Sequence, residues 1–144
     1  FKALVESLNM RRDIQTSNLK GTGETKIMTE VDALDQTANM NISHIGGNLT
    51  DTVTAELRKV EALDLATIYL DLPIEQEAAA SAYAELEELG FFWGSWIPNY
   101  TGHKDILRLQ KIYQSVDVNK IICAREQGEN VKKYVVSEWQ RVSK

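Results

Sequence analysis

The sequence predicts a single α/β (α+β) domain, residues 1–144, with a mixed, mainly antiparallel sheet and helices on both faces. Two observations predict this class. Helical and extended hydrophobic patterns alternate along the chain, which is typical of helices packed on a sheet. Residues 66–112 also read as strand, helix, strand and strand, with the densest apolar content in the sequence. A chain of 144 residues is long enough to bury one sizeable core.

The first third of the chain predicts a helix, a loop and a β-hairpin. Apolar residues between Phe1 and Leu8 recur at helical spacing, and residues 16–25 contain a glycine-rich turn. Residues 24–32 have strand propensity, and residues 39–45 alternate between apolar and polar side chains. We therefore expect these two segments to pair as an antiparallel hairpin.

A helical crossover is expected after the hairpin. Two glycines break the second strand, and residues 50–63 follow with an amphipathic helical pattern that Thr50 or Asp51 is expected to cap. The apolar run at 66–72 is the next strand. Because a helix separates the two strands, we expect them to lie parallel to each other.

The rest of the chain predicts a helix, two further strands and a final helix. Glycine is the usual residue just past the end of a helix, and proline interrupts strand pairing. The expected elements are a helix at 75–89 that stops at Gly90, a strand at 91–97 that ends at Pro98, a strand at 106–112 and a helix at about 126–142.

Composition restricts the classes of function. The net charge of −5 argues against a nucleic-acid footprint and against adsorption to anionic membranes. No apolar run approaches the roughly 20 residues that span a bilayer. The single Cys123 cannot form an internal disulfide, so we expect a cytoplasmic protein. Because the chain starts at Phe1 rather than Met, we expect it to be a fragment of a longer protein.

Three short motifs occur in a familiar order. They are the strand end Tyr69-Leu70-Asp71-Leu72-Pro73, the helix stop Leu89-Gly90-Phe91 and the strand Leu107-Arg108-Leu109-Gln110. In this order they resemble the second half of a GNAT-type N-acyltransferase. More specifically, they resemble a GNAT-like bacterial module found beside an anti-sigma, histidine-kinase-type ATPase domain. The resemblance covers most of residues 38–140.

The resemblance implies a GNAT-like fold and a small-molecule ligand, acetyl-CoA or another acyl-CoA. It also implies a protein partner or neighbouring domain in bacterial signalling. In the family, the loop between the central strand and the following helix holds the CoA pyrophosphate on backbone N–H groups. The residues that correspond to this loop are the candidate cofactor-binding residues Ile45, Gly46, Gly47 and Asn48.

The sequence departs from the family pattern at two places. No Arg or Gln stands three residues before a Gly-x-Gly, and Asp51 would place negative charge beside the phosphates. The tyrosine that acts as a general acid in many active members corresponds here to Leu86, which has no proton to donate. Both departures favour a domain that keeps the acyltransferase-like fold but lacks the catalytic activity.

Two carboxylates are candidate catalytic bases. Glu30 is expected on a strand that could border an acceptor cleft, and Asp71 is expected near the end of the central strand, where open α/β sheets place ligands. Each also has a simpler interpretation. Glu30 could be a charge on an exposed strand, and Asp71 could bind backbone N–H groups near Pro73. The two histidines and one cysteine show no metal-binding spacing.

Two functions therefore stay open. The leading hypothesis is a non-catalytic GNAT-like regulatory, sensing or interaction domain. The alternative is an acyl-CoA-dependent N-acetyltransferase in which an amine attacks the thioester directly. Whether the groove between strands 39–45 and 66–72 is open or filled by side chains is the observation that bears most on this choice. An open groove with N–H groups pointing into it would favour the ligand-binding hypotheses.

Overall fold

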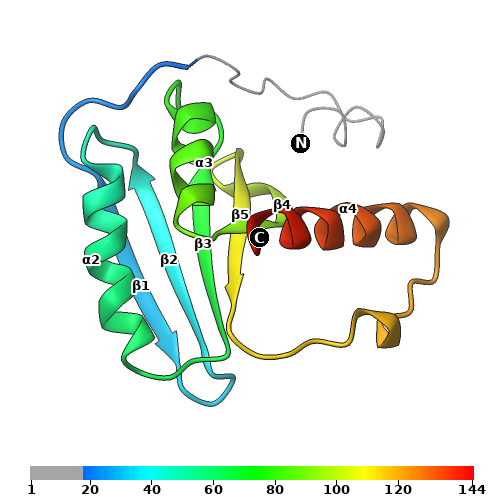
Figure 1. Ribbon diagram of the computed structural model, residues 1–144. Coiled ribbons are helices and arrows are strands. Elements are labelled where there is room, and N and C mark those ends of the chain that lie inside the picture. The colour runs from blue at the N-terminus through cyan, green and yellow to red at the C-terminus, as the bar shows by residue number, and fades with distance from the viewer. Residues whose placement is uncertain (1–17) are drawn as a thin grey trace.

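The computed structural model of the chain describes residues 18–144, so the predicted helix between Phe1 and Leu8 lies outside the described residues. The elements alternate between extended and helical segments along the chain (Figure 1). They are β1 (Lys26–Asp32), β2 (Thr37–His44), α2 (Leu49–Glu61), β3 (Thr67–Pro73), α3 (Ala79–Glu88), β4 (Phe92–Thr101), β5 (Lys104–Ile112), a 3-10 turn (Val118–Lys120) and α4 (Glu126–Val142).

The described strands form one five-stranded sheet in the order β1-β2-β3-β5-β4. β1 and β2 pair antiparallel, as predicted for the hairpin, and β2 and β3 pair parallel, as predicted from the crossover helix. β5 pairs antiparallel with both β3 and β4. The mixed, mainly antiparallel sheet confirms the predicted fold class. The order of elements is also the one implied by the resemblance to a GNAT-like domain.

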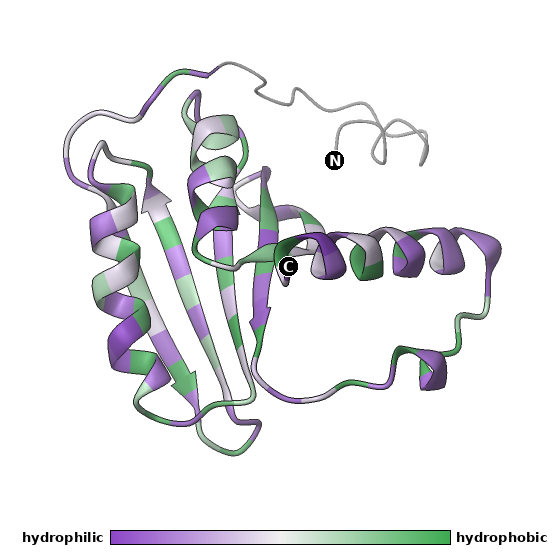
Figure 2. Cartoon of the chain, viewed as in Figure 1, coloured by the Kyte–Doolittle hydropathy of each residue, from purple (hydrophilic) through white to green (hydrophobic). Residues whose placement is uncertain are grey.

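The two faces of the sheet differ sharply in polarity. Side chains alternate along β2, so that Met40 and Ile42 are buried while Asn39 and Asn41 lie on the opposite face. The same alternation is visible along the central strands in Figure 2. Helices α2 and α3 contact each other and share one core with the apolar face. The opposite face carries polar side chains that include Asn39, Asp71 and Arg108, which makes it a candidate ligand surface.

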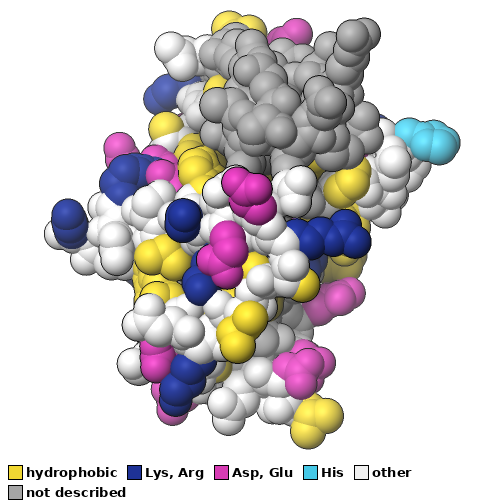
Figure 3. Space-filling view, turned by 90° about the vertical axis from the view of Figure 1, so that its right-hand side faces the viewer, with side chains coloured by type: hydrophobic (Ala, Val, Ile, Leu, Met, Phe, Trp, Pro, Cys, Tyr) yellow, Lys and Arg dark blue, Asp and Glu magenta, His cyan; other side chains and the backbone are white. Residues whose placement is uncertain are grey.

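Helix α4 lies against β4, the edge strand of the sheet. Trp139 stacks on Phe92 with ring centroids 5.9 Å apart, and Tyr134 meets Trp93 edge-on at 5.2 Å. Phe92 and Trp93 point to opposite faces of the sheet, because they are neighbours in one strand. Helix α4 therefore contacts both faces of this edge strand. Arg141 also pairs with Glu87 of α3. Side chains of both charges are interspersed over this side of the molecule (Figure 3).

Two predicted boundaries were wrong. β4 continues through Pro98 to Thr101, because β4 is an edge strand and its pairing with β5 is irregular between Ile97 and Thr101. Helix α3 begins only at Ala79, since residues 75–78 form turns. The predicted stop at Gly90 is confirmed: this residue has a φ of 90°, a conformation that glycine adopts without steric cost.

Candidate functional site

The groove between β2 and β3 is filled by one side chain, which is not the outcome that favours ligand binding. The two strands pair only as far as Asn41 and Asp71, although β2 continues to His44. Beyond that point Gln76, just before α3, takes the place of a neighbouring strand. Its Oε1 accepts a hydrogen bond from the Ile45 N–H at 2.9 Å, and its Nε2 donates to the Ser43 carbonyl at 2.8 Å. A single amide group thus satisfies both backbone groups that face the gap.

The glycine pair after β2 packs against a second stretch of backbone. The Gly46 N–H donates to Thr25 Oγ1 at 3.0 Å, and the Gly47 N–H donates to the Gly23 carbonyl at 2.9 Å. A Cβ atom at Gly46 would lie 2.3 Å from the Thr25 nitrogen. Glycine is therefore required at position 46 by the close approach of two chain segments. We call residues 21–25 together with residues 45–48 the glycine clasp.

The start of α2 differs from the prediction. Thr50 or Asp51 was expected to cap this helix, but the N-cap residue is Asn48, and its side chain makes no capping hydrogen bond. Asn48 Oδ1 instead accepts from the Thr25 N–H at 2.8 Å, within the clasp. The Thr50 hydroxyl donates to Glu85 of α3 at 2.7 Å. These polar side chains are used in contacts between elements rather than at the end of their own helix.

The candidate cofactor-binding residues form the short connection between β2 and α2. Their N–H groups at positions 45, 46 and 47 each donate to an acceptor of the protein. Sequence reasoning missed the two residues that supply side-chain acceptors, Gln76 and Thr25. No local motif marks either residue, because both act across the fold at sequence separations of 31 and 21.

Asp71 lies on the polar face of the sheet, completely buried. Arg108 on β5 donates two hydrogen bonds to this carboxylate: Nε lies 2.7 Å from Oδ1, and Nη2 lies 2.9 Å from Oδ2. Asn39 Nδ2 donates to Oδ2 as well, at 3.2 Å. The hydrogen bonds to Asp71 raise the pKa of Arg108 above its ordinary value. Asp71 is thus tied to side chains of neighbouring strands, rather than to backbone near Pro73 as one interpretation had it.

Glu30 lies in a pocket of about 360 Å³ on the same polar face. In the strand register it stands opposite Asn39, the residue that binds Asp71, so both candidate carboxylates lie on one face with Asn39 between them. Asn39 Oδ1 is buried and accepts no hydrogen bond from the described residues. The lining of the pocket is Lys26, Ile27, Met28, Glu30, Asn39, Asn41, Ser43 and Tyr100.

The polar pocket and the filled gap adjoin each other along β2. Ser43 contributes its side chain to the pocket and its carbonyl to the bond with Gln76. Tyr100 reaches the pocket from the far end of β4, a position that sequence reasoning did not assign to the site. The site therefore combines a gap whose backbone groups are bound by Gln76 with a polar pocket beside it.

His44 stands outside this arrangement. Its Nε2 lies 2.9 Å from the Thr22 carbonyl, so the ring supports the clasp from the end of β2. In residues 18–144 no group of three or more histidine, cysteine or acidic side chains is arranged to hold a metal ion. Among the helices of the same part of the chain, none is both long enough and apolar enough to cross a bilayer.

Comparison with known proteins found similar solved structures but no similar sequences. No protein-family model and no curated protein sequence matches the chain. A chimera of spermidine N-acetyltransferase from Vibrio cholerae and hSSAT is 19% identical, with a TM-score of 0.49 over 61% of this chain and 57% of that one. The Vibrio cholerae enzyme with CoA and spermine is 18% identical, with a TM-score of 0.48 over 61% and 56%.

The ribosomal-protein-S18-alanine N-acetyltransferase of Escherichia coli is 21% identical, with a TM-score of 0.46 over 67% of this chain and 65% of that one. The chain thus spans less than two thirds of each of these three neighbours. Their names are those of N-acetyltransferases, the class of the alternative hypothesis, and none of the names mentions a signalling or anti-sigma role. Likeness at this level carries no argument about activity.

Proposed function

We propose that this domain binds an acyl-CoA in the gap between β2 and β3 and transfers the acyl group to an amine. One observation carries the proposal: the gap is filled by the side-chain amide of Gln76, which donates to Ser43 and accepts from Ile45. The extended arm of CoA contains amide groups with the same donor and acceptor. Such a ligand can therefore replace Gln76 without leaving either backbone group unpaired.

The chemistry that fits this placement is direct attack on the thioester. The amine nitrogen forms a bond to the acyl carbon, the carbon–sulfur bond breaks, and the CoA thiolate leaves. The proton lost by the attacking amine passes to a base. Glu30 is the better candidate for this base, because it lines the pocket beside the gap. Asp71 already accepts hydrogen bonds on both oxygens, so its role here is to hold Asn39 and Arg108 in position.

A second function is favoured by a different observation. All three N–H groups at positions 45–47 already donate to protein acceptors, and Leu86, at the position of the family's general acid, is completely buried. A domain closed in this way could serve as a non-catalytic regulatory or interaction module with a protein partner. In that case the glycine clasp and Gln76 are permanent parts of the structure.

Titration calorimetry with acetyl-CoA separates the two functions. We compare the unmodified chain with Gln76→Ala and with a control, Gln114→Ala. Gln114 is a matched control because it is an exposed glutamine. If the ligand displaces Gln76, the Gln76→Ala variant binds acetyl-CoA about 5- to 100-fold more tightly than the chain, because about two hydrogen bonds no longer compete. Gln114→Ala leaves the affinity unchanged. Mass spectrometry of a mixture of acetyl-CoA and simple amines then detects any acetylated product.

Absence of binding by both the chain and Gln76→Ala would contradict acyl-CoA binding and leave the non-catalytic module. Binding without an acetylated product would contradict acyl transfer alone. If a product forms, Glu30→Gln is expected to lower kcat by about 10²-fold or more, the size of a typical general-base contribution. An unchanged kcat in this variant would remove Glu30 from the mechanism.

A further inference from the structure

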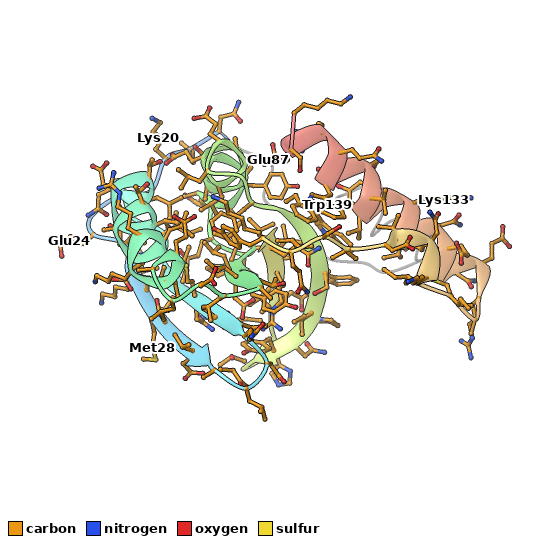
Figure 4. All side chains as sticks on the ribbon, turned by 60° about the horizontal axis from the view of Figure 1, so that its bottom comes forward. Lys20, Glu24, Met28, Glu87, Lys133 and Trp139 are labelled. Atoms are coloured by element: carbon orange, nitrogen blue, oxygen red, sulfur yellow. The ribbon has the colours of Figure 1, made fainter. Side chains whose placement is uncertain are left out.

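The outer edge of β1 has no partner strand among the described residues. β1 ends the sheet, and no strand within residues 18–144 pairs with its outer side. Such an edge presents unpaired N–H and C=O groups that can bind another strand. It is also apolar in part: Met28 is 67% exposed and Val31 is 48% exposed. Figure 4 shows Met28 at the rim of the molecule, pointing away from the helices.

We infer that this edge pairs antiparallel with the β1 edge of a second copy of the chain. The sequence of β1 is self-complementary when two copies run in opposite directions about Thr29. The pairing places Lys26 opposite Asp32, Ile27 opposite Val31 and Met28 opposite Glu30, each pair occurring twice. Opposite charges meet at both ends of the interface, and an apolar pair stands next to each of them. Cross-strand pairs of these kinds stabilise antiparallel sheets.

The faces of the strand agree with this register. Ile27 packs against the core, and the Thr29 hydroxyl donates to Glu56 of α2 at 3.1 Å, so odd-numbered residues face the helices. Val31 belongs to the same side by alternation. In the paired edge, Val31 of one copy covers Ile27 of the other, and the core continues across the interface. The two-fold symmetry makes the same strand serve both partners.

The charges argue for a second copy rather than an unrelated strand. Asp32 Oδ1 accepts from the N–H groups of Leu34 and Asp35 in the β1–β2 turn. The proposed register places this carboxylate opposite Lys26 of the other copy. A copy of the chain satisfies both charged ends at once. The contact is one strand long, which is small for a permanent interface. The dimer is therefore expected to dissociate on dilution.

Sedimentation velocity over a concentration series tests the inference on the whole chain. Met28→Glu places a carboxylate opposite Glu30 of the second copy, twice per dimer, and is expected to weaken dimerisation about 10-fold. The double variant Met28→Glu/Glu30→Lys creates two opposite-charge pairs and is expected to restore the affinity to within about threefold. Gln140→Glu, an exposed change on α4, is the charge control and leaves dimerisation unchanged.

Hydrogen exchange supplies a second measurement at the strand itself. Amide protection in β1 is expected to rise with protein concentration for the chain and for Gln140→Glu, but not for Met28→Glu. A chain that stays monomeric at several hundred micromolar would overturn the inference. A dimer that Met28→Glu does not weaken, or that the double variant does not restore, would place the interface on another surface and overturn it equally.

Discussion

The ion pair between Asp71 and Arg108 is expected to be the most sensitive polar contact in the domain. Asp71 is completely buried, and the Arg108 side chain is 25% exposed. Replacing Arg108 by Met keeps an unbranched apolar side chain but removes both charged donors. Asp71 would then retain only the bond from Asn39. A buried charge that loses its partner destabilises a protein by about 3–5 kcal/mol. The partial exposure of Arg108 favours the lower end, about 3 kcal/mol.

Urea denaturation followed by circular dichroism measures this loss. The double variant Asp71→Asn/Arg108→Met removes the buried charge together with its partner. It is expected to recover about 1–3 kcal/mol relative to Arg108→Met alone, because no uncompensated carboxylate stays buried. Lys133→Met, an exposed change on α4, is the matched control and should alter the free energy of unfolding by less than about 0.5 kcal/mol. A loss below about 1 kcal/mol for Arg108→Met, or no recovery in the double variant, would refute the reasoning.

Three further predictions concern packing, the clasp and pH. Leu86→Ala removes a completely buried side chain and should lower the free energy of unfolding by about 2–5 kcal/mol in urea denaturation. Gly46→Ala forces a Cβ against the Thr25 backbone and should cost about 3 kcal/mol by the same measurement; a loss below 1 kcal/mol would mean that the clasp yields easily. The hydrogen bond from Arg141 lowers the pKa of Glu138, so its stabilisation is present above about pH 4.3 and is lost as pH falls through the lowered pKa. The stability difference between the chain and Arg141→Met, under about 1 kcal/mol for an exposed pair, should therefore shrink between pH 6 and pH 3.

Local patterns were sufficient to predict most of the elements. The alternation at 39–45 and the helical stripes at 50–63 and 126–142 follow from local spacing, and the structure confirms these elements. The parallel pairing of β2 and β3 follows from the crossover rule. The boundary errors at residues 75–78 and at Pro98 have a common physical cause. In both places contacts with segments distant in the sequence, rather than local propensity, decide the conformation. Gln76 binds the backbone of residues 43 and 45, and Pro98 lies in an edge strand that pairs with β5.

The site was only partly predictable. The Gly46-Gly47 turn and the two carboxylates could be found because their residue types suggest chemistry. Their partners could not, since Gln76 and Arg108 are ordinary polar residues until the fold brings them to β2 and β3. The register between β3 and β5, which sets Arg108 opposite Asp71, is not encoded in any local pattern. Long-range hydrogen bonds to backbone are therefore the part of the site that needed a structure.

The glycine clasp has a consequence for the order in which the domain folds. Its hydrogen bonds join pairs of residues that are separated by 21, 23 and 24 positions in the sequence, with the whole β1–β2 hairpin in between. Closing a loop of that size costs chain entropy unless something has already brought its ends together. The hairpin does so, which means that the clasp closes after the hairpin has formed. Slow hydrogen exchange at the Gly46 and Gly47 amides would then report the completion of this half of the sheet.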